Sequence, residues 1–213
     1  MSVPVITSVQ EVEIRSRSPP PRERVKAHKW LTARAQEGYR AREGKGFELY
    51  ISKVAEEKIR NHALEHVHEN KEVMGLLLGG VYHHGGTEFT LVRDVATTDL
   101  DATAVSVRFD RDAFEKLFES LDDCGFTYVI VGWYHSHPSY GCFMSATDIQ
   151  TQRGMFDRPY HSAVVIDPIN REIEAFYLNG GKVETRAFGV YWDAHQDPYY
   201  GRTVRMRQIE KGT

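Results

Sequence analysis

The sequence is poor in cysteine and contains no long apolar run. Its two cysteines, Cys124 and Cys142, form no CxxC pair and cannot build a disulfide framework. We therefore expect a reducing, cytoplasmic location. The apolar run around residues 74–78 suits a strand and is far shorter than the roughly 20 residues of a membrane-spanning helix. No signal peptide is expected, because Glu11, Glu13 and several arginines follow the first residues in place of an apolar segment.

Charge is divided unevenly along the chain. Residues 1–45 carry ten Lys/Arg against five Asp/Glu, a net +5, which leaves −8 for the remainder of a chain whose total is −3. An acidic body argues against nucleic acid as the main partner and suits a basic partner segment. We therefore expect three parts: a basic, proline-containing extension (1–45), a folded domain (46–190) and a C-terminal tail (191–213). The extension is expected to be partly disordered or to include a docking helix within 25–42, with Trp30, Leu31 and Tyr39 as candidate anchors.

Apolar periodicity predicts an α/β (α+β) domain. Strands are predicted at residues 47–51, 72–82, 88–95, 105–109, 127–134, 161–166, 172–178 and 182–188. Helices are predicted after Ser52, from Asp110 and from Ser145. The other histidines are expected to be structural: His62, His66 and His68 at the surface or end of a helix, and His83–His84 in a hairpin turn.

Two histidines and an aspartate follow the strand predicted at 127–134. His135 and His137 are two residues apart in an extended segment, so both side chains point to the same side. Seven residues separate His137 from Ser145, and Asp148 lies one turn into the next helix. Two imidazoles and one carboxylate form a three-ligand zinc set with the fourth position left for water. Alternatively, the histidines are ordinary loop residues and Ser145-x-x-Asp148 is a helix cap, a role compatible with metal binding.

Glu72 precedes a nearly continuous apolar run, residues 73–80, which indicates a strand buried on both faces. A solvated position between a helix and a strand is one interpretation of this acid. Together with the histidine motif, an acid there is a candidate general base, which takes a proton from water and returns it to the leaving amine. The residues alone also allow the reverse, with Asp148 as the base and Glu72 as the ligand.

These residues resemble the JAMM (MPN-plus) zinc isopeptidases, most closely the deubiquitinating member of the proteasome lid. The similarity is carried by residues 72–76, 131–152 and 163–168 and extends over about 47–190, as in a standalone prokaryotic-type homologue. It implies an MPN/JAMM catalytic domain, with a central mixed, curved sheet flanked by helices in a cytidine-deaminase-like layout.

The resemblance also implies a role for each site residue. His135, His137 and Asp148 would hold one Zn²⁺ with a bound water, whose pKa zinc lowers from about 15.7 to about 7. Glu72 would act on that water, and Ser145 would steady the oxyanion.

The function implied by the resemblance is removal of ubiquitin or a ubiquitin-like modifier after its C-terminal Gly-Gly, by deconjugation or by precursor processing. The implied partners are that modifier and the proteasome, with no nucleic acid and no membrane. A peptidase acting on a ubiquitin-like sulfur-carrier protein and a non-catalytic MPN scaffold are the alternatives. A deaminase is disfavoured because the sequence lacks H-x-E and P-C-x-x-C. Residues 96–104 depart from the proteasome-lid pattern, which leaves the substrate open.

Overall fold

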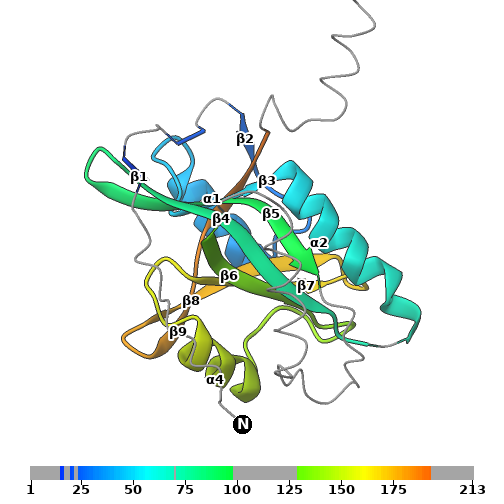
Figure 1. The fold of residues 1–213 in the computed structure, drawn as a ribbon. Helices are drawn as coiled ribbons and strands as arrows, with labels where there is room; N and C mark the ends of the chain where they lie inside the picture. The colour runs from blue at the N-terminus through cyan, green and yellow to red at the C-terminus, as the bar shows by residue number, and fades with distance from the viewer. Residues whose placement is uncertain (1–14, 17–19, 22–23, 70, 98–128, 193–213) are drawn as a thin grey trace, which may run out of the picture.

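The structure, a computed structural model, describes residues 15–16, 20–21, 24–69, 71–97 and 129–192 (Figure 1). Within these ranges the chain forms a ten-stranded sheet with helices on both faces. The strand predicted at 105–109, the helix predicted from Asp110, Cys124 and nearly all of the C-terminal tail lie outside the described residues.

The elements follow one another in a mixed order. The strands are β1 Arg15–Ser16, β2 Val25–Lys26, β3 Leu49–Ser52, β4 Met74–His84, β5 Thr87–Thr97, β6 Val129–Ser136, β7 Ser162–Asp167, β8 Glu172–Asn179, β9 Lys182–Thr185 and β10 Phe188–Tyr191. The helices are α1 Ala33–Arg42, α2 Lys53–Glu65 and α4 Ala146–Met155, with a short 3-10 helix, η1, at Val67–Glu69.

The sheet runs in the order β2-β10-β3-β5-β4-β6-β7-β8-β9, and β1 pairs with β4 beside this path. The pairs β10–β3, β3–β5 and β6–β7 are parallel, whereas β5–β4–β6 and β7–β8–β9 are antiparallel. The first six residues of β4 and all of β7 are buried, as a strand in the middle of a covered sheet requires. The predicted mixed sheet of an α/β fold is therefore confirmed.

Alternate residues of the central strands pack on opposite faces of the sheet. Tyr134 of β6 and Leu77 of β4 join a core with Ile59 of α2, whereas Trp133 and Leu76 join a second core beside α4. The indole Nε1–H of Trp133 also donates to Gln152 Oε1 in α4 at 2.6 Å. Figure 1 shows α2 on the right and α4 at the bottom, on different sides of the sheet.

The second half of the N-terminal extension is part of this packing. Only Ala33–Arg42 of the predicted segment 25–42 is helical, because Val25–Lys26 pairs instead with β10. Trp30 and Tyr39, two of the predicted anchors, are buried in the core, and Leu31 is partly buried against it. The division of the chain at residues 45 and 190 remains a prediction.

Two local predictions were wrong. The strand predicted at 182–188 is interrupted at Arg186, whose guanidinium turns inward and donates to Pro159 O at 2.7 Å and Ser162 Oγ at 3.0 Å. The chain then crosses to β3, where β10 pairs in parallel. The surface position predicted for His62 is also wrong: the residue lies in the last turn of α2, as the helix-end alternative predicted, but it is only 7% exposed, with Nδ1 lying 2.7 Å from the Tyr134 hydroxyl.

The predicted hairpin between β4 and β5 is present, but its turn is Gly85–Gly86, and both histidines before it belong to β4. The φ angles of the two glycines, 59° and 83°, are the left-handed values that this turn needs. None of the helices in the described ranges is long and apolar enough to cross a bilayer.

Candidate metal centre

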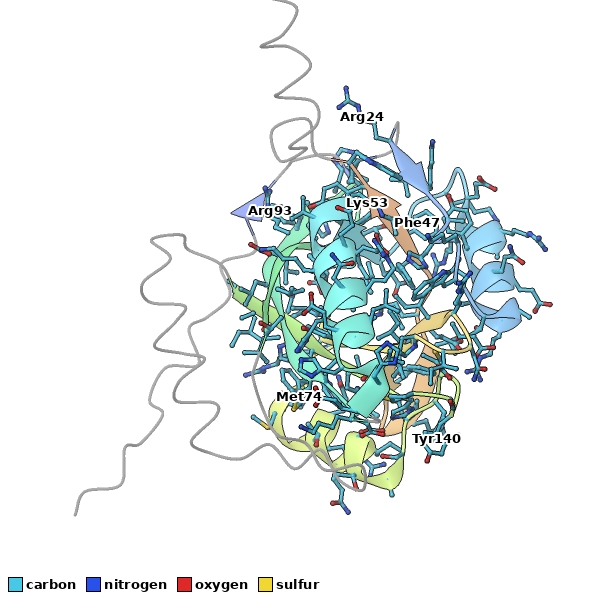
Figure 2. All side chains as sticks on the ribbon, turned by 90° about the vertical axis from the view of Figure 1, so that its right-hand side faces the viewer. Arg24, Phe47, Lys53, Met74, Arg93 and Tyr140 are labelled. Atoms are coloured by element: carbon cyan, nitrogen blue, oxygen red, sulfur yellow. The ribbon has the colours of Figure 1, made fainter. Side chains whose placement is uncertain are left out.

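Strand β6 delivers the two histidines at its C-terminal end. It continues two residues beyond the predicted limit, so that His135 lies opposite Met74 of β4 and Val165 of β7. His137 follows the strand, and its backbone N–H donates to Ile166 O at 2.9 Å. In Figure 2, Met74 and Tyr140 both lie toward the lower end of the molecule, far from Lys53 and Arg24, and this end carries the site.

A glycine lets β6 approach β7 closely. Gly132 has φ 151°, and a Cβ there would lie 2.0 Å from Ser162 O. The register of β6 against β4 shifts at the same place, between Leu77 and Leu78. Beyond this shift Trp133 and His135 share one face, with their rings stacked at 4.4 Å between centroids. The packed indole fixes the plane of the first imidazole.

The start of α4 places the carboxylate. Ser145 is the N-cap, and its Oγ accepts the Asp148 N–H at 3.2 Å while the Ser145 N–H donates to Asp148 Oδ2 at 2.6 Å. This reciprocal pair is the capping box expected from the sequence. It orients Asp148, which is 5% exposed, toward the histidines. The cap and the cluster are therefore one arrangement.

The three side chains converge on one point. Asp148 Oδ2 lies 3.5 Å from His135 Nε2 and 3.6 Å from His137 Nε2, and all three candidate ligand atoms lie within 4.8 Å of one another. Ligands held about 2.1 Å from a tetrahedral zinc stand roughly 3.4 Å apart, so the spacing fits this ion. Neither ring nitrogen of the fully buried His135 has a hydrogen-bond partner among the described residues. Such a group is costly to bury unless another atom meets it, and a cation would do so.

The charges of the cluster also suit a metal. Burial opposes ionisation of Asp148, but the two histidines close to its carboxylate and the hydrogen bond from Ser145 hold its pKa well below the ordinary value. Burial lowers the pKa of His135, which keeps that imidazole neutral. Burial would do the same for His137, but Asp148 and Glu72 outweigh it and raise the pKa. The set is thus an ionised carboxylate beside the neutral His135 imidazole, and the raised pKa of His137 shows that the two acids favour positive charge at this point.

Glu72 lies beside this cluster, two residues before β4. The next residue, Val73, is bonded twice to Ser136: its N–H donates to Ser136 Oγ and its carbonyl accepts the Ser136 N–H, both at 2.9 Å. Burial and the charge of Asp148 raise the pKa of Glu72, while the charge of His137 opposes the rise. A raised pKa makes this half-buried carboxyl a stronger proton acceptor than an ordinary glutamate, as a general base requires.

Two supporting residues were not recognised in the sequence. The carbonyl of Gly141 lies 3.3 Å from His137 Nδ1, and Asp167 accepts the Gly141 N–H at 2.7 Å. Asp167 belongs to the stretch 163–168 that carries part of the family resemblance, but no local pattern joins it to a loop 26 residues earlier.

The neighbouring side chains differ in exposure. Trp133 and Tyr134 are buried, whereas Tyr140 and Phe143 are exposed, and the Phe143 ring centroid is 4.7 Å from that of His137. The Cys142 thiol donates to Val165 O at 3.3 Å, and burial raises its pKa to about 12. This cysteine is therefore a packed, protonated thiol.

Comparison with known proteins adds the family. The family described as "JAB1/Mov34/MPN/PAD-1 ubiquitin protease" matches residues 46–157, more than half of the 213 residues. The chain belongs to this family. The match spans the five residues of the site, so the MPN domain contains the whole cluster.

Curated relatives share this MPN domain. The 26S proteasome regulatory subunit RPN11 of Eremothecium gossypii is 40% identical over 124 residues, which is 57% of this chain and 38% of the relative. The COP9 signalosome complex subunit 5 of Gibberella zeae is 40% identical over 127 residues, 57% of this chain and 34% of the relative. In Saccharomyces cerevisiae the "Ubiquitin carboxyl-terminal hydrolase RPN11" is 38% identical over 124 residues, 57% of this chain and 39% of the relative. The chain thus spans less than two fifths of each of these relatives.

A solved structure supports the fold. The solution structure of a protein from Desulfitobacterium hafniense matches with a TM-score of 0.51 at 22% identity. The match covers 70% of this chain and 97% of that one. At this identity the likeness is one of fold alone, and it agrees with the α/β architecture of the MPN domain.

Proposed function

We propose that this MPN domain is a zinc-dependent isopeptidase that cleaves after the C-terminal Gly-Gly of ubiquitin or a ubiquitin-like modifier. The bond cut is the one to a lysine side chain or to a precursor extension. The observation that carries the proposal is the convergence of His135 Nε2, His137 Nε2 and Asp148 Oδ2 in one buried cluster beside Glu72. The names of the family and of the yeast relative, a ubiquitin protease and a ubiquitin carboxyl-terminal hydrolase, point to the same substrate class.

One Zn²⁺ per chain would be held by His135, His137 and Asp148. When bound, this ion lowers the pKa of a bound water and polarises the carbonyl that is attacked. Glu72 takes the proton of the attacking water and passes it to the leaving amine, which is why its raised pKa matters. The Ser145 oxygen already accepts the Asp148 N–H, so its own hydroxyl proton is available to the developing oxyanion.

The test is a panel of modifier fusions ending in Gly-Gly, incubated with the zinc-loaded chain and with chelator-treated chain. We expect cleavage after Gly-Gly that chelator abolishes and added zinc restores. Cleavage confined to a sulfur-carrier fusion would move the assignment to the carrier-protein peptidase. A chain that binds no zinc at any stoichiometry and cleaves no fusion would be a non-catalytic scaffold.

The proposed partner is the modifier itself, recognised through its narrow Gly-Gly end, in the cytoplasm. An association with the proteasome is part of the proposal, supported by the names of the RPN11 relatives. Co-sedimentation of the full chain with purified proteasomes tests it. Migration of the chain at its own mass throughout the gradient would remove the proteasome from the list of partners.

A further inference from the structure

We propose that Asp167 is a positioning residue for His137, acting through the backbone of Gly141. The inference rests on the proposed zinc function, because it concerns how one of the ligands is held. Asp167 is the last residue of β7 and is fully buried. It does not belong to the metal cluster, and its carboxylate contacts the loop that follows His137.

The Asp167 carboxylate joins two turns of the chain. Its Oδ1 accepts backbone N–H groups from Ser139 at 3.1 Å, Ile169 at 2.9 Å and Asn170 at 3.0 Å. Its Oδ2 accepts the Gly141 N–H at 2.7 Å and the Asn170 side-chain amide at 2.7 Å. Burial opposes ionisation, but these donors outweigh it and hold the pKa of Asp167 below its ordinary value. The group is therefore a carboxylate that only accepts.

The loop after His137 has a backbone that needs this support. Ser139 has φ 71° and Gly141 has φ 77°, both in the left-handed region, which is unusual for a serine. Such conformations persist where surrounding contacts over-determine them. Asp167 holds the N–H groups of both residues, from the strand that β6 also pairs with.

Fixing Gly141 fixes the second nitrogen of His137. The Gly141 carbonyl lies 3.3 Å from His137 Nδ1, so an Nδ1–H donates to it and the lone pair remains on Nε2. Nε2 is the atom 3.6 Å from Asp148 Oδ2. An acceptor on the far nitrogen sets both the tautomer and the ring plane of a ligand histidine. His135 differs, because its Nδ1 has no hydrogen-bond partner in the described part of the chain and its ring stacks on Trp133.

The substitution Asp167→Asn separates this role from packing. It keeps the shape of the side chain but replaces one accepting oxygen with an NH₂ group. If that group takes the place of Oδ2, it faces the Gly141 N–H; in the flipped orientation it faces the three N–H groups around Oδ1. Either way a donor meets a donor, and the loop must move.

The experiment uses the full chain and three variants: Asp167→Asn, the double variant Asp167→Asn/Asn170→Asp, and Glu56→Gln as a matched control. Glu56 is another buried, hydrogen-bonded carboxylate, located in α2 and bonded to His28. Zinc affinity is measured by competition with a chromophoric chelator, thermal stability on the apo protein, and exchange of the His137 Nδ1–H by NMR on the zinc-loaded protein.

We expect Asp167→Asn to weaken zinc binding by about 10- to 100-fold. Exchange of the Nδ1–H should become at least about tenfold faster, because its acceptor is no longer fixed. Glu56→Gln should lower the melting temperature while leaving the zinc affinity and the exchange rate of the His137 Nδ1–H at the parental values. The double variant Asp167→Asn/Asn170→Asp keeps a carboxylate and a carboxylate–amide pair between positions 167 and 170. Its melting temperature should therefore return toward that of the parent, but its zinc affinity should stay low.

Two results would overturn the proposal. The first is a zinc affinity and an Nδ1–H exchange rate equal to those of the parent in Asp167→Asn or, if that variant does not fold, in the double variant. The second, which needs no variant, is an unprotected His137 Nδ1–H in the zinc-loaded parent. A parent that binds no zinc would instead refute the proposed function. A parent that binds zinc and cleaves, beside an Asp167→Asn variant identical to it, would refute this inference alone.

Discussion

Glu72 is the residue on which turnover is expected to depend most without affecting the metal. Glu72→Gln keeps the size of the side chain and removes its ability to take a proton. We expect the rate constant for cleavage of a Gly-Gly fusion to fall by about 10²- to 10⁴-fold. Zinc content, measured on the same preparation, should stay at one per chain.

The matched control for that change is Glu69→Gln. Glu69 is an exposed glutamate that pairs with Lys71 and lies three residues before Glu72. It should cleave at the parental rate. Turnover by Glu72→Gln within a few-fold of the parent would remove Glu72 from the mechanism and return Asp148 as the candidate base.

Ser145 has two duties at the residue scale, and they can be separated. Ser145→Ala removes an N-cap, which costs about 1 kcal/mol of stability, and removes a hydroxyl beside the cluster. We expect turnover to fall by about 100-fold or more if the hydroxyl steadies the oxyanion. Stability comes from urea denaturation and turnover from steady-state kinetics.

Ser52→Ala is the control for loss of a helix cap, and it also removes the hydroxyl that donates to Arg93 O at 2.8 Å. Ser52 caps α2, where its Oγ accepts the Ala55 N–H at 3.0 Å, away from the histidines. It should lose comparable stability and retain turnover. Equal turnover in both variants would leave Ser145 as a helix cap only.

At the scale of the element, α2 is attached to the N-terminal segment by a buried charge cluster around Glu56. Glu56 Oε1 lies 2.7 Å from His28 Nε2 and 3.0 Å from Arg60 Nε, and Lys53 bonds the other oxygen. Burial would raise the pKa of Glu56, but hydrogen bonds from His28 and Lys53 lower it to about 2 from its ordinary value of 4.5.

This shift predicts a pH dependence of stability. Because the folded-state pKa is depressed, the stabilisation is complete above pH 4.5 and is lost as the pH falls from 4.5 toward 2, by an amount on the order of 3 kcal/mol. Glu56→Gln should be less stable than the parent at pH 7 and lose less on acidification. Urea denaturation between pH 7 and pH 3 measures both, and parallel curves for the two proteins would contradict the assignment.

Whether a feature could be predicted from the sequence depends on how far apart in the chain its residues lie. The convergence of His135, His137 and Asp148 was predictable because the three residues lie within 14 positions, on one strand end and the next helix start, where local rules on caps and alternation apply. The burial of His62 was not predictable, since its partner Tyr134 lies 72 residues away. The break at Arg186 likewise depends on acceptors 24 to 27 residues earlier and on a parallel partner, β3, near the other end of the domain. Contacts set by the fold leave no periodic signal in the segment itself.

For the whole molecule, the structure implies that the segment from residue 24 unfolds together with the sheet. Trp30 packs in the same core as residues of α2, β4 and β10. Trp30→Ala should therefore lower the stability of the whole domain by about 3 kcal/mol, within a single urea transition followed by both fluorescence and circular dichroism.

Leu64→Ala is the control, because Leu64 is 36% exposed at the end of α2. It should shift the transition only slightly. Two separate transitions in the parent, with only the first sensitive to Trp30→Ala, would show that the N-terminal segment is an independent unit.

Strand β10 has a further effect, on the order in which the sheet can be assembled. Its four residues lie between β2 and β3, although they come from the end of the described chain. Among the described residues β2 pairs only with β10, so this pairing cannot form until residue 191 has left the ribosome. Pairings this distant in sequence form slowly. Until then the nascent chain carries an open strand edge at β3, on the side where β10 later pairs.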